Sequence, residues 1–457
     1  MIYTQVFDRY GRPGVVRAGI IGAGHYATAV VTQSESIPRL LVPVVADLSA
    51  EAARQAFRRA GHADEDIVTC ESRAEALAAI ERGKRVVLTD ALLMMDLPLD
   101  VVVEATGSSA AGALHAREAI RHGKHVAMVN KEADVTVGPI LKHLADQAGL
   151  VYTAVDGDQH GLLMGLVSWA RELGLEIVCG GKARDSGLLY DASRGAIMQQ
   201  NKLLPLAPAQ AALFAPLVPG RAAEFVRGRL EAAGRAGELG YYDYEELTIA
   251  ANVTGLKPDV ERLHHPLVRT VEIPEVLSPV SEGGILQHAG AVDCVITLCQ
   301  AHEADLGGGV FVVVTAATEY SRYILATKGC ISNQSGYTSL IYRPYHLCGV
   351  ETAISILCAG LLSMPTGATE YKPRFDVLGR ATKTKRAGDV WELEDLEDLI
   401  RPAAAIGPDA PLPTQMVYDQ HVARTVRAGE LVTGAMVVEP EDSPLWALRR
   451  EQDALLL

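Results

Sequence analysis

Three short polar clusters carry the residue types that acid–base chemistry on a carbonyl compound requires. They are Asn130-Lys131-Glu132, Asp156-Gly157-Asp158-Gln159-His160 and Gly180-Gly181-Lys182, and each follows a short apolar run. A lysine can polarise a carbonyl oxygen or move a proton when burial or a neighbour adjusts its pKa. Carboxylates can take a hydroxyl proton, hold substrate hydroxyls or bind a divalent cation. We therefore predict four catalytic residues: Lys131, Asp156, Asp158 and Lys182.

Each cluster also has an ordinary structural interpretation. Lys131 and Glu132 could form a surface ion pair, Asp156 or Asp158 could cap a helix near residue 160, and Lys182 could be solvated. Three clusters at successive strand ends favour function, because open α/β sheets hold their ligands there. No third carboxylate is identifiable from spacing, so no metal ligand is assigned and a magnesium or manganese ion is not expected on balance.

Charged residues beside these clusters are candidates for substrate binding. Arg184 and Arg194 follow the third cluster, and their charge suits a phosphate or carboxylate. Glu132 adjoins Lys131 in the first cluster. We predict all three as substrate-binding residues on the basis of position and charge.

A glycine-rich turn points to a dinucleotide cofactor. The segment Gly22-Ala23-Gly24-His25-Tyr26-Ala27 follows a predicted strand and opens a predicted helix. Gly22 permits a tight turn, Gly24 lets a diphosphate approach the backbone, and Ala27 allows close packing of helix and strand. Asp47 ends the next predicted strand, where it can bind a ribose diol. The predicted cofactor contacts are Gly22, Gly24, His25, Tyr26, Asp47, Thr106, Gly107 and Asn130.

The choice between NAD and NADP stays open at this point. Asp47 favours NAD, because a carboxylate would repel a 2′-phosphate. Ser49, Arg54, Arg58 and Arg59 lie just downstream and could offset that repulsion.

The elements that must position these residues alternate regularly in the first third of the chain. This alternation predicts a Rossmann-type doubly wound parallel sheet with helices on both faces. The predicted strands are 15–24, 40–47, 67–70, 85–90, 99–107, 124–130 and 151–159. The predicted helices start at His25 and cover 49–60, 73–82, 110–122, 137–148 and 160–174.

The rest of the chain has a different pattern. Strand signals at 175–181, 308–317 and 335–344 and an apolar helix at 349–367 predict an α+β region. The tail contains a weak repeat, 381–391 and 423–432, each read as a strand, a glycine turn and a second strand. We predict three domains: a dinucleotide-binding domain at 1–155, an α+β catalytic and oligomerisation domain at 156–375, and a small β-rich module at 376–457.

Composition excludes several classes of protein. The 457 residues carry a net charge of −14, which argues against nucleic acid or an anionic membrane as a partner. No apolar run of membrane-spanning length occurs, and the first residues lack a signal-peptide pattern. The seven cysteines form no CxxC pair, which is typical of reduced thiols. We expect a cytoplasmic protein that binds a small-molecule substrate and forms a homodimer.

These segments together resemble a known group. The glycine turn, VVVEATGS at 101–108, HGKHVAMVNKEAD at 122–134, GDQ at 157–159 and YRPYHLCGVE at 342–351 resemble NAD(P)-dependent oxidoreductases distantly related to homoserine dehydrogenase. The tail looks like the SAF-type module that this group carries. The resemblance covers most of the chain and is weakest between residues 185 and 260.

Within the group, the chain looks like 1-deoxy-D-xylulose 5-phosphate reductoisomerase-like enzymes of isoprenoid biosynthesis, whose relatives act on branched sugar acids. N-K-E at 130–132 and D-G-D-x-H at 156–160 are similar to the N-K-E and metal-binding D-S-E-H segments of the reductoisomerase. Its remaining metal ligands have no counterpart here, and neither does the N-G-T-T-N signature of homoserine dehydrogenase. The resemblance implies isomerisation coupled to hydride transfer on a small polyhydroxylated, phosphorylated or acidic substrate.

Two alternatives remain from the sequence. One is a simple dehydrogenase or oxidoisomerase of a hydroxy acid or sugar acid without phosphate. The other is a non-catalytic sensor or assembly protein that binds the cofactor without turnover.

Overall fold

The computed structural model describes residues 2–199, 202–234, 240–300 and 303–457, which fold as two compact units. The first unit comprises Met1–Gly161 and Leu347–Leu457, and the second comprises Leu162–His346. The chain passes from the first to the second within helix α7 (Gln159–Glu172). The three-domain division at residues 155 and 375 stays a prediction.

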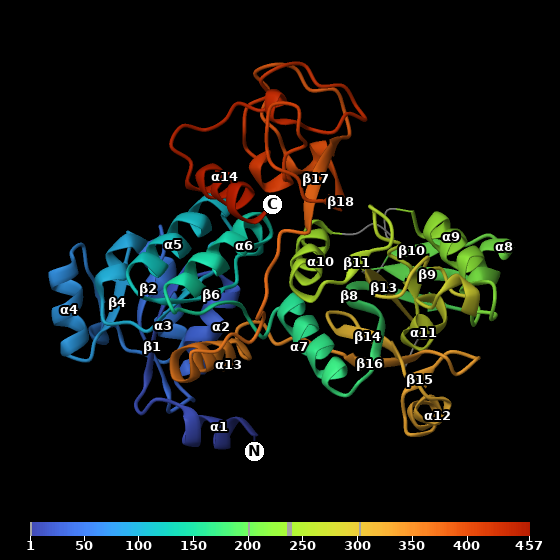
Figure 1. The fold of residues 1–457 in the computed structure, drawn as a ribbon, viewed down its shortest axis with the longest axis horizontal. Coiled ribbons are helices and arrows are strands. Elements are labelled where there is room, and N and C mark those ends of the chain that lie inside the picture. The colour runs from blue at the N-terminus through green and yellow to red at the C-terminus, as the bar shows by residue number, and fades with distance from the viewer. Residues whose placement is uncertain (1, 200–201, 235–239, 301–302) are drawn as a thin grey trace. The chain divides into compact units, whose positions relative to one another are not determined.

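A seven-stranded parallel sheet forms the centre of the first unit (Figure 1). Its order is β3-β4-β2-β1-β5-β6-β7, which confirms the predicted Rossmann-type sheet. The chain leaves β1 toward β2 and later returns to β5 on the other side of β1, so the topological switch point lies between β1 and β5. The strands are β1 Val16–Ile21, β2 Leu40–Ala46, β3 Ile67–Thr69, β4 Arg85–Leu88, β5 Val101–Glu104, β6 His125–Met128 and β7 Tyr152–Ala154.

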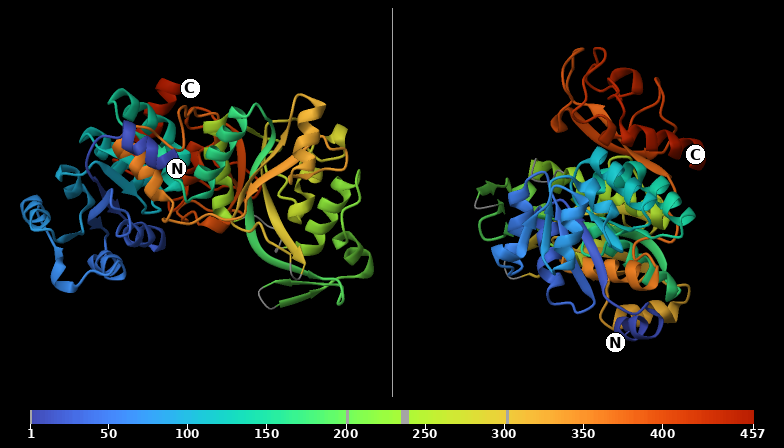
Figure 2. Two further views of the ribbon diagram at one scale, coloured as in Figure 1. Left: turned by 90° about the horizontal axis from the view of Figure 1, so that it is seen from below. Right: turned by 90° about the vertical axis from the view of Figure 1, so that its left-hand side faces the viewer.

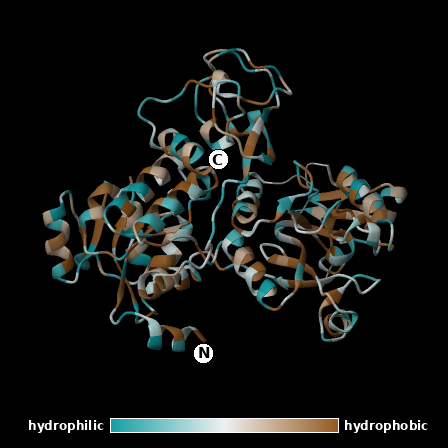
Figure 3. Cartoon of the chain, viewed as in Figure 1, coloured by the Kyte–Doolittle hydropathy of each residue, from teal (hydrophilic) through white to brown (hydrophobic). Residues whose placement is uncertain are grey.

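Helices cover both faces of this sheet, and its strands are apolar along most of their length rather than alternating, as Figure 3 shows. The core on one face gathers α2 (His25–Ser34), α3 (Ala50–Arg59) and α13 (Thr352–Leu357). Against the other face lie α5 (Ser109–Arg121) and α6 (Lys131–Gln147), on which the C-terminal helix α14 (Pro444–Leu456) packs. Two peripheral helices, α1 (Ile2–Tyr10) and α4 (Arg73–Glu81), finish the N-terminal region.

Helix α6 begins earlier than the predicted residue 137. Asn130 caps it, because its side-chain oxygen accepts a hydrogen bond from the Ala133 backbone N–H at 3.0 Å. Lys131 is therefore the first residue of the helix, directly after the end of β6. The cap places Lys131 at the carboxyl edge of the sheet.

The two copies of the weak tail repeat, 381–391 and 423–432, pair with each other about a local pseudo-twofold axis. Lys385 and Val426 exchange backbone hydrogen bonds of 2.9 Å in both directions. The N–H of Gly388 donates to Val422 O at 2.8 Å, and the N–H of Gly429 donates to Ala381 O, also at 2.8 Å. Both glycines have the positive φ of the predicted turns, +90° and +88°. Isolated bridges flank them, and the named strands of this region are β17 (Phe375–Ala381) and β18 (Leu396–Pro402).

A mixed sheet forms the centre of the second unit, in agreement with the predicted α+β class. The predicted strand at 175–181 extends into β8 (Glu176–Asp191), which runs parallel to β13 (Ala291–Gln300) and antiparallel to β14 (Val310–Thr315). Figure 2 shows β8 continuing into its hairpin with β9 (Ala196–Gln199). The remaining strands are β10 Lys202–Pro205, β11 Lys257–Pro258, β12 Leu267–Val268, β15 Ile331–Ser332 and β16 Ser339–Arg343.

Helices complete the second unit. They are α8 Pro208–Ala211, α9 Ala222–Ala233, α10 Tyr241–Thr254, α11 Ile273–Val276 and α12 Glu319–Thr327. Within the described ranges, no helix combines the length and the apolar character needed to cross a membrane.

Candidate active site

The glycine turn after β1 has the shape that a dinucleotide requires. A Cβ on Gly22 would lie 2.5 Å from the carbonyl oxygen of Ala105, and its φ is +94°, so the turn excludes a side chain there. A Cβ on Gly24 would meet no atom within 4 Å, so the start of α2 is open on that side. The chain thus offers an uncovered helix N-terminus at the switch point of the sheet, which fits a diphosphate.

Asp47 lies beside this turn, as predicted. Its carboxylate accepts hydrogen bonds from the backbone N–H groups of Ala23 at 2.7 Å and Ser49 at 2.8 Å. These bonds fix the carboxylate next to the glycine turn. A carboxylate has further lone pairs, so Asp47 can still accept from a ribose hydroxyl.

The basic residues after Asp47 are largely occupied. Arg54 donates to Ile67 O and Thr69 Oγ1, and Arg58 pairs with Glu51 and Asp64 at 2.7 Å each. The Arg58 hydrogen bond lowers the pKa of Asp64 below its usual value.

Tyr26 and His25 begin α2 but face different surroundings. His25 is exposed. The Tyr26 hydroxyl instead lies 2.7 Å from Thr352 Oγ1 and 3.4 Å from the carbonyl oxygen of Asp156. The phenol of Tyr26 therefore contacts the acidic turn that follows β7.

A buried polar network organises the ends of β5 and β6. Glu104 is fully buried, and its Oε1 accepts from Thr106 Oγ1 at 2.7 Å and lies 3.1 Å from His115 Nδ1. Asn130 Nδ2 donates to Thr106 Oγ1 at 3.2 Å and to Ser108 O at 2.9 Å. Thr106, Gly107 and Asn130, three predicted cofactor contacts, thus lie together at the sheet edge.

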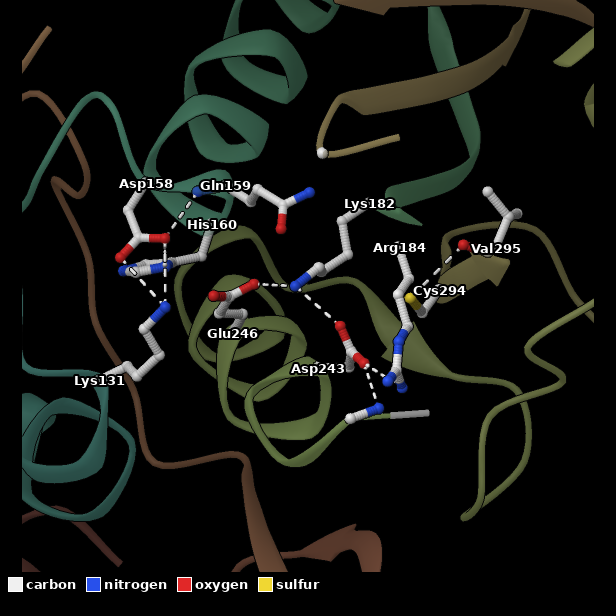
Figure 4. Close-up of polar contacts among 12 residues, drawn as sticks. Lys131, Asp158, Gln159, His160, Lys182, Arg184, Asp243, Glu246, Cys294 and Val295 are labelled. Atoms are coloured by element: carbon white, nitrogen blue, oxygen red, sulfur yellow. Dashed lines mark hydrogen bonds and ion pairs between the residues drawn. The ribbon is translucent and has the colours of Figure 1, made fainter. Parts of the chain in front are cut away.

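Lys131 and Asp158 form an ion pair at this same edge (Figure 4). Lys131 Nζ lies 3.3 Å from each carboxylate oxygen of Asp158, and the two side chains are 17% and 7% exposed. Asp158 also accepts the backbone N–H of Gln159 at 2.9 Å, and His160 Nδ1 lies 3.8 Å from Asp158 Oδ1. The structure therefore brings two of the predicted catalytic residues together.

Asp156 is held through its main chain. Its N–H donates to Ser355 Oγ at 2.8 Å, and its carbonyl accepts from Thr352 Oγ1 at 2.9 Å. Gly157, at the centre of the turn, has φ of +94°. The backbone of the acidic turn is thus fixed by α13.

Two acidic residues of the first turn of α6 are buried. Burial raises the pKa of Glu132, and its Oε1 lies near Gly107. Burial also raises the pKa of Asp134 to about 7, although Tyr152 Oη donates to its Oδ1 at 2.8 Å. Tyr371, from the C-terminal part of the chain, donates to the carbonyl oxygen of Asp134 at 3.0 Å.

Lys182, in the second unit, is buried between two carboxylates of α10 (Figure 4). Its Nζ lies 2.9 Å from Asp243 Oδ1 and also pairs with Glu246. Burial opposes the charged form, but the two carboxylates raise the pKa of Lys182 above its ordinary value. Lys182 is therefore a charged lysine whose charge is already balanced by its neighbours.

The two predicted arginines of the second unit lie apart. Arg184 Nη1 lies 3.5 Å from Asp243 Oδ2, so it joins the Lys182 group. Arg194 lies in the turn after β8, where it pairs with Asp191 at 3.6 Å and is 63% exposed. The strand from Arg184 to Asp191 is roughly 20 Å long, so Arg194 is remote from this group.

Sequence reasoning did not identify several of these residues. Glu104 carried a local signal, since it is a charged residue inside an apolar strand. Asp243 and Glu246 have helical spacing, but nothing in the sequence connects them to Lys182. Thr352 and Ser355 lie in a segment that reads simply as an apolar helix.

Two parts of the chain match protein-family models. Residues 43–152 match a model described as "Homoserine dehydrogenase, NAD binding domain". Residues 243–352 match "Oxidoreductase DRL, catalytic domain", a segment that begins at Asp243. These matches support an NAD(P)-dependent oxidoreductase with an NAD-binding domain.

Several solved structures are similar to part of the chain. A levoglucosan dehydrogenase in complex with NADH and L-sorbose is 17% identical over 38% of this chain and 44% of its own, with a TM-score of 0.27. A 3-ketoreductase variant from Actinomadura kijaniata in complex with TDP-benzene and NADP is 16% identical over 38% and 49%, also with a TM-score of 0.27. An apo scyllo-inositol dehydrogenase from Lactobacillus casei is 14% identical over 38% and 47%, with a TM-score of 0.28. The chain thus spans about half the length of these proteins, and no curated protein matches its sequence.

Proposed function

We propose that this chain transfers a hydride between a nicotinamide dinucleotide and a carbonyl or alcohol carbon of a small polyhydroxylated substrate. The Lys131–Asp158 pair carries this proposal. It places an ammonium group, held by a buried carboxylate, at the carboxyl edge of the sheet. The open turn at Gly24 belongs to the same edge. Acid–base residues and a dinucleotide cradle on one edge are the components that such an oxidoreductase needs.

The proposed chemistry uses few groups. When bound, the nicotinamide supplies or accepts the hydride. In the reducing direction, Lys131 Nζ donates a proton to the carbonyl oxygen, and in the oxidising direction it accepts the proton from the hydroxyl. Asp158 holds Nζ in place and stabilises its positive charge. The imidazole of His160 lies 3.8 Å from the same carboxylate. Limited exposure of the pair strengthens these electrostatic interactions.

The proposal assigns the second-unit lysine a different role. Lys182 already pairs with two carboxylates, so its charge is poorly suited to attracting a further anion. We therefore assign Lys182 a positioning role within the second unit, where Arg184 Nη1 lies 3.5 Å from Asp243 Oδ2, and substrate binding by Arg184 stays a prediction.

We propose NAD as the preferred cofactor. Asp47 is fixed beside the turn, and Arg54 and Arg58 are engaged elsewhere, so neither is available for a 2′-phosphate. Arg59 is exposed at the end of α3 and is the remaining basic candidate.

Isomerisation coupled to hydride transfer remains a prediction from the resemblance. It would begin with removal of a substrate hydroxyl proton, for which Asp156 or Asp158 is the candidate base. Assays with deoxyxylulose phosphate and a panel of sugar acids and hydroxy acids, followed by analysis of the carbon connectivity of the product, distinguish it from simple dehydrogenation.

Substitution of the cradle glycine tests the cofactor assignment. Gly24 has φ −70° and ψ −171°, which alanine adopts without strain, and its missing Cβ faces open space. We expect Gly24→Ala to weaken NADH binding at least about tenfold, measured by fluorescence titration, while the melting temperature stays unchanged. Gly165, on α7, has equally open surroundings, so Gly165→Ala is the matched control and should bind NADH normally.

NADH titration and the turnover assays together separate the alternatives. If Gly24→Ala bound NADH with wild-type affinity, the glycine turn would not be the dinucleotide site. Tight NADH binding without turnover across the whole substrate panel would instead favour a non-catalytic sensor.

A further inference from the structure

Three segments that are distant in sequence meet through hydroxyl groups in the first unit. Tyr26 Oη, at the start of α2, lies 2.7 Å from Thr352 Oγ1 at the start of α13. Thr352 Oγ1 also donates to the carbonyl oxygen of Asp156 at 2.9 Å. One threonine hydroxyl thus joins the dinucleotide turn to the acidic turn.

A second hydroxyl, that of Ser355, binds the backbone N–H of Asp156, the residue whose carbonyl oxygen Thr352 binds. The N–H of Asp156 donates to Ser355 Oγ at 2.8 Å, and Ser355 Oγ lies 2.7 Å from Thr366 Oγ1. Thr352 and Ser355 are fully buried, so water cannot replace them as partners. The position of the acidic turn therefore depends on α13.

The backbones around these hydroxyls are in close contact. A Cβ on Gly157 would lie 2.9 Å from Leu347 O and 3.2 Å from Tyr26 Oη. A Cβ on Gly349 would lie 2.5 Å from Tyr26 O and 2.9 Å from Val30 N. A shift of α2 must therefore be transmitted to its neighbours, because the packing leaves no free space.

We propose that Tyr26 and Thr352 are positioning residues that link dinucleotide binding at the start of α2 to the placement of Asp158 and, through it, of Lys131 Nζ. This inference rests on the proposed function and deepens it. Tyr26 donates to Thr352 Oγ1, which donates in turn to the carbonyl oxygen of Asp156, two residues before the carboxylate that pairs with Lys131. A cofactor diphosphate that orders the first turn of α2 thereby orders the acidic turn as well.

Tyr26 suits this role because it keeps its proton. Burial, followed by the nearby charge of Asp158, raises the pKa of the Tyr26 phenol above its usual value. A neutral phenol retains its proton, which it donates to Thr352 Oγ1 while the threonine hydroxyl donates to the Asp156 carbonyl oxygen.

Amide hydrogen exchange of the full chain tests the link, with NADH as the probe. We expect saturating NADH to slow exchange in a peptide covering residues 156–160 at least about tenfold in the wild type. In Thr352→Val and in Tyr26→Phe, at an NADH concentration that saturates each variant, this protection is lost. Thr352→Ser, which keeps the hydroxyl, restores it.

The control variant removes a hydroxyl that has no part in the link. Thr32 Oγ1 donates to Thr28 O within α2, so Thr32→Val should keep the NADH-dependent protection. Tyr26→Phe retains the ring, so it keeps the test valid if Thr352→Val folds poorly.

The outcomes are distinguishable. Undiminished protection in both hydroxyl variants overturns the inference, and so does wild-type NADH binding without protection of residues 156–160. Failure of the wild type to bind NADH or NADPH at all contradicts the proposed function itself.

Discussion

The side chain of Gln452 occupies a gap in the hydrogen bonding of a helix that begins at Lys131. Its Oε1 accepts the backbone N–H of Ile140 at 3.2 Å, and its Nε2 donates to the carbonyl of Thr136, also at 3.2 Å. These two backbone groups would normally bond to each other across one helical turn. Pro139 lies between them and disturbs that turn, so α14 supplies the missing partners for α6.

Substitution of Gln452 should therefore cost stability. Gln452→Met keeps the approximate volume but leaves two buried backbone groups unsatisfied, at about 1–3 kcal/mol each. Chemical denaturation should show a lower free energy of unfolding. Gln147→Met, at an exposed site on α6, should change it by less than about 0.5 kcal/mol, and equal losses in both variants would refute the interpretation.

Removal of the Lys131 charge should abolish most turnover but not cofactor binding. We expect Lys131→Met to lower kcat by roughly 10²–10⁴ with the substrate that the panel identifies, and to leave the dissociation constant of NADH unchanged. Asp158→Asn should cause a smaller loss. The double variant should fall well short of the product of the two effects, because the residues act as a pair.

Lys142 provides the matched control for this series. It lies on the same helix, is similarly buried, and pairs with Asp146, which is 55% exposed. Lys142→Met should retain wild-type kcat. Turnover by Lys131→Met at the wild-type rate would remove Lys131 from the mechanism.

Asp134 should make stability fall as pH rises. Its pKa is raised to about 7 by burial, whereas the unfolded chain has the ordinary value of about 3.9. The folded protein therefore binds the extra proton between these values, and the stabilisation present below about pH 4 is lost progressively up to about pH 7, on the order of 4 kcal/mol in total. Asp134→Asn, which stays neutral, should remove this part of the slope.

Urea unfolding at pH 5 and pH 8 measures the difference between the two proteins. Contributions from other titrating groups cancel in the comparison. An identical pH dependence in wild type and Asp134→Asn would show that the carboxyl is not neutral in the folded state.

The two halves of the tail repeat differ in one pair of buried residues, and the pair of the second half can be introduced into the first by substitution. Lys385 and Asp395 form a buried ion pair, while the pseudosymmetric positions hold the buried apolar residues Val426 and Met436. Lys385→Val alone leaves Asp395 paired only with the exposed Lys383 and should cost about 1–3 kcal/mol. The double variant Lys385→Val/Asp395→Met copies the second half and should be neutral or more stable than the wild type.

Thermal unfolding of the single and double variants checks this expectation. Lys383, which also pairs with Asp395, is 54% exposed and can be solvated after the exchange. A double variant less stable than either single variant would show that the halves are not equivalent in packing.

Local patterns predicted the parallel sheet of the first unit well. The glycine turn, the strand–helix alternation and the polar residues after β6 and β7 are neighbours in sequence or in a regular sheet, so spacing alone brings Lys131 to Asp158. Helix α6 was predicted to start at residue 137 rather than at Lys131, and Gln452, which compensates for Pro139 within it, comes 312 residues after Ile140.

Other parts of the site have no local signature. The hydroxyl of Thr352 contacts that of Tyr26, although the two residues are 326 positions apart in sequence. Lys182 pairs with Glu246, which is 64 positions away. Such pairs arise from the packing of whole elements, which periodicity and motif spacing do not encode. The identity of their partners is therefore visible only in the folded chain.

The first unit consists of two segments that are far apart in sequence, so they are synthesised at different times. Its sheet strands are made early, but Thr352, Tyr371 and Gln452 belong to Leu347–Leu457, which is translated after the whole of the second unit. The second unit, Leu162–His346, is continuous and can mature during synthesis. The core of the dinucleotide-binding region therefore stays incomplete until these later segments have been synthesised, after the second unit.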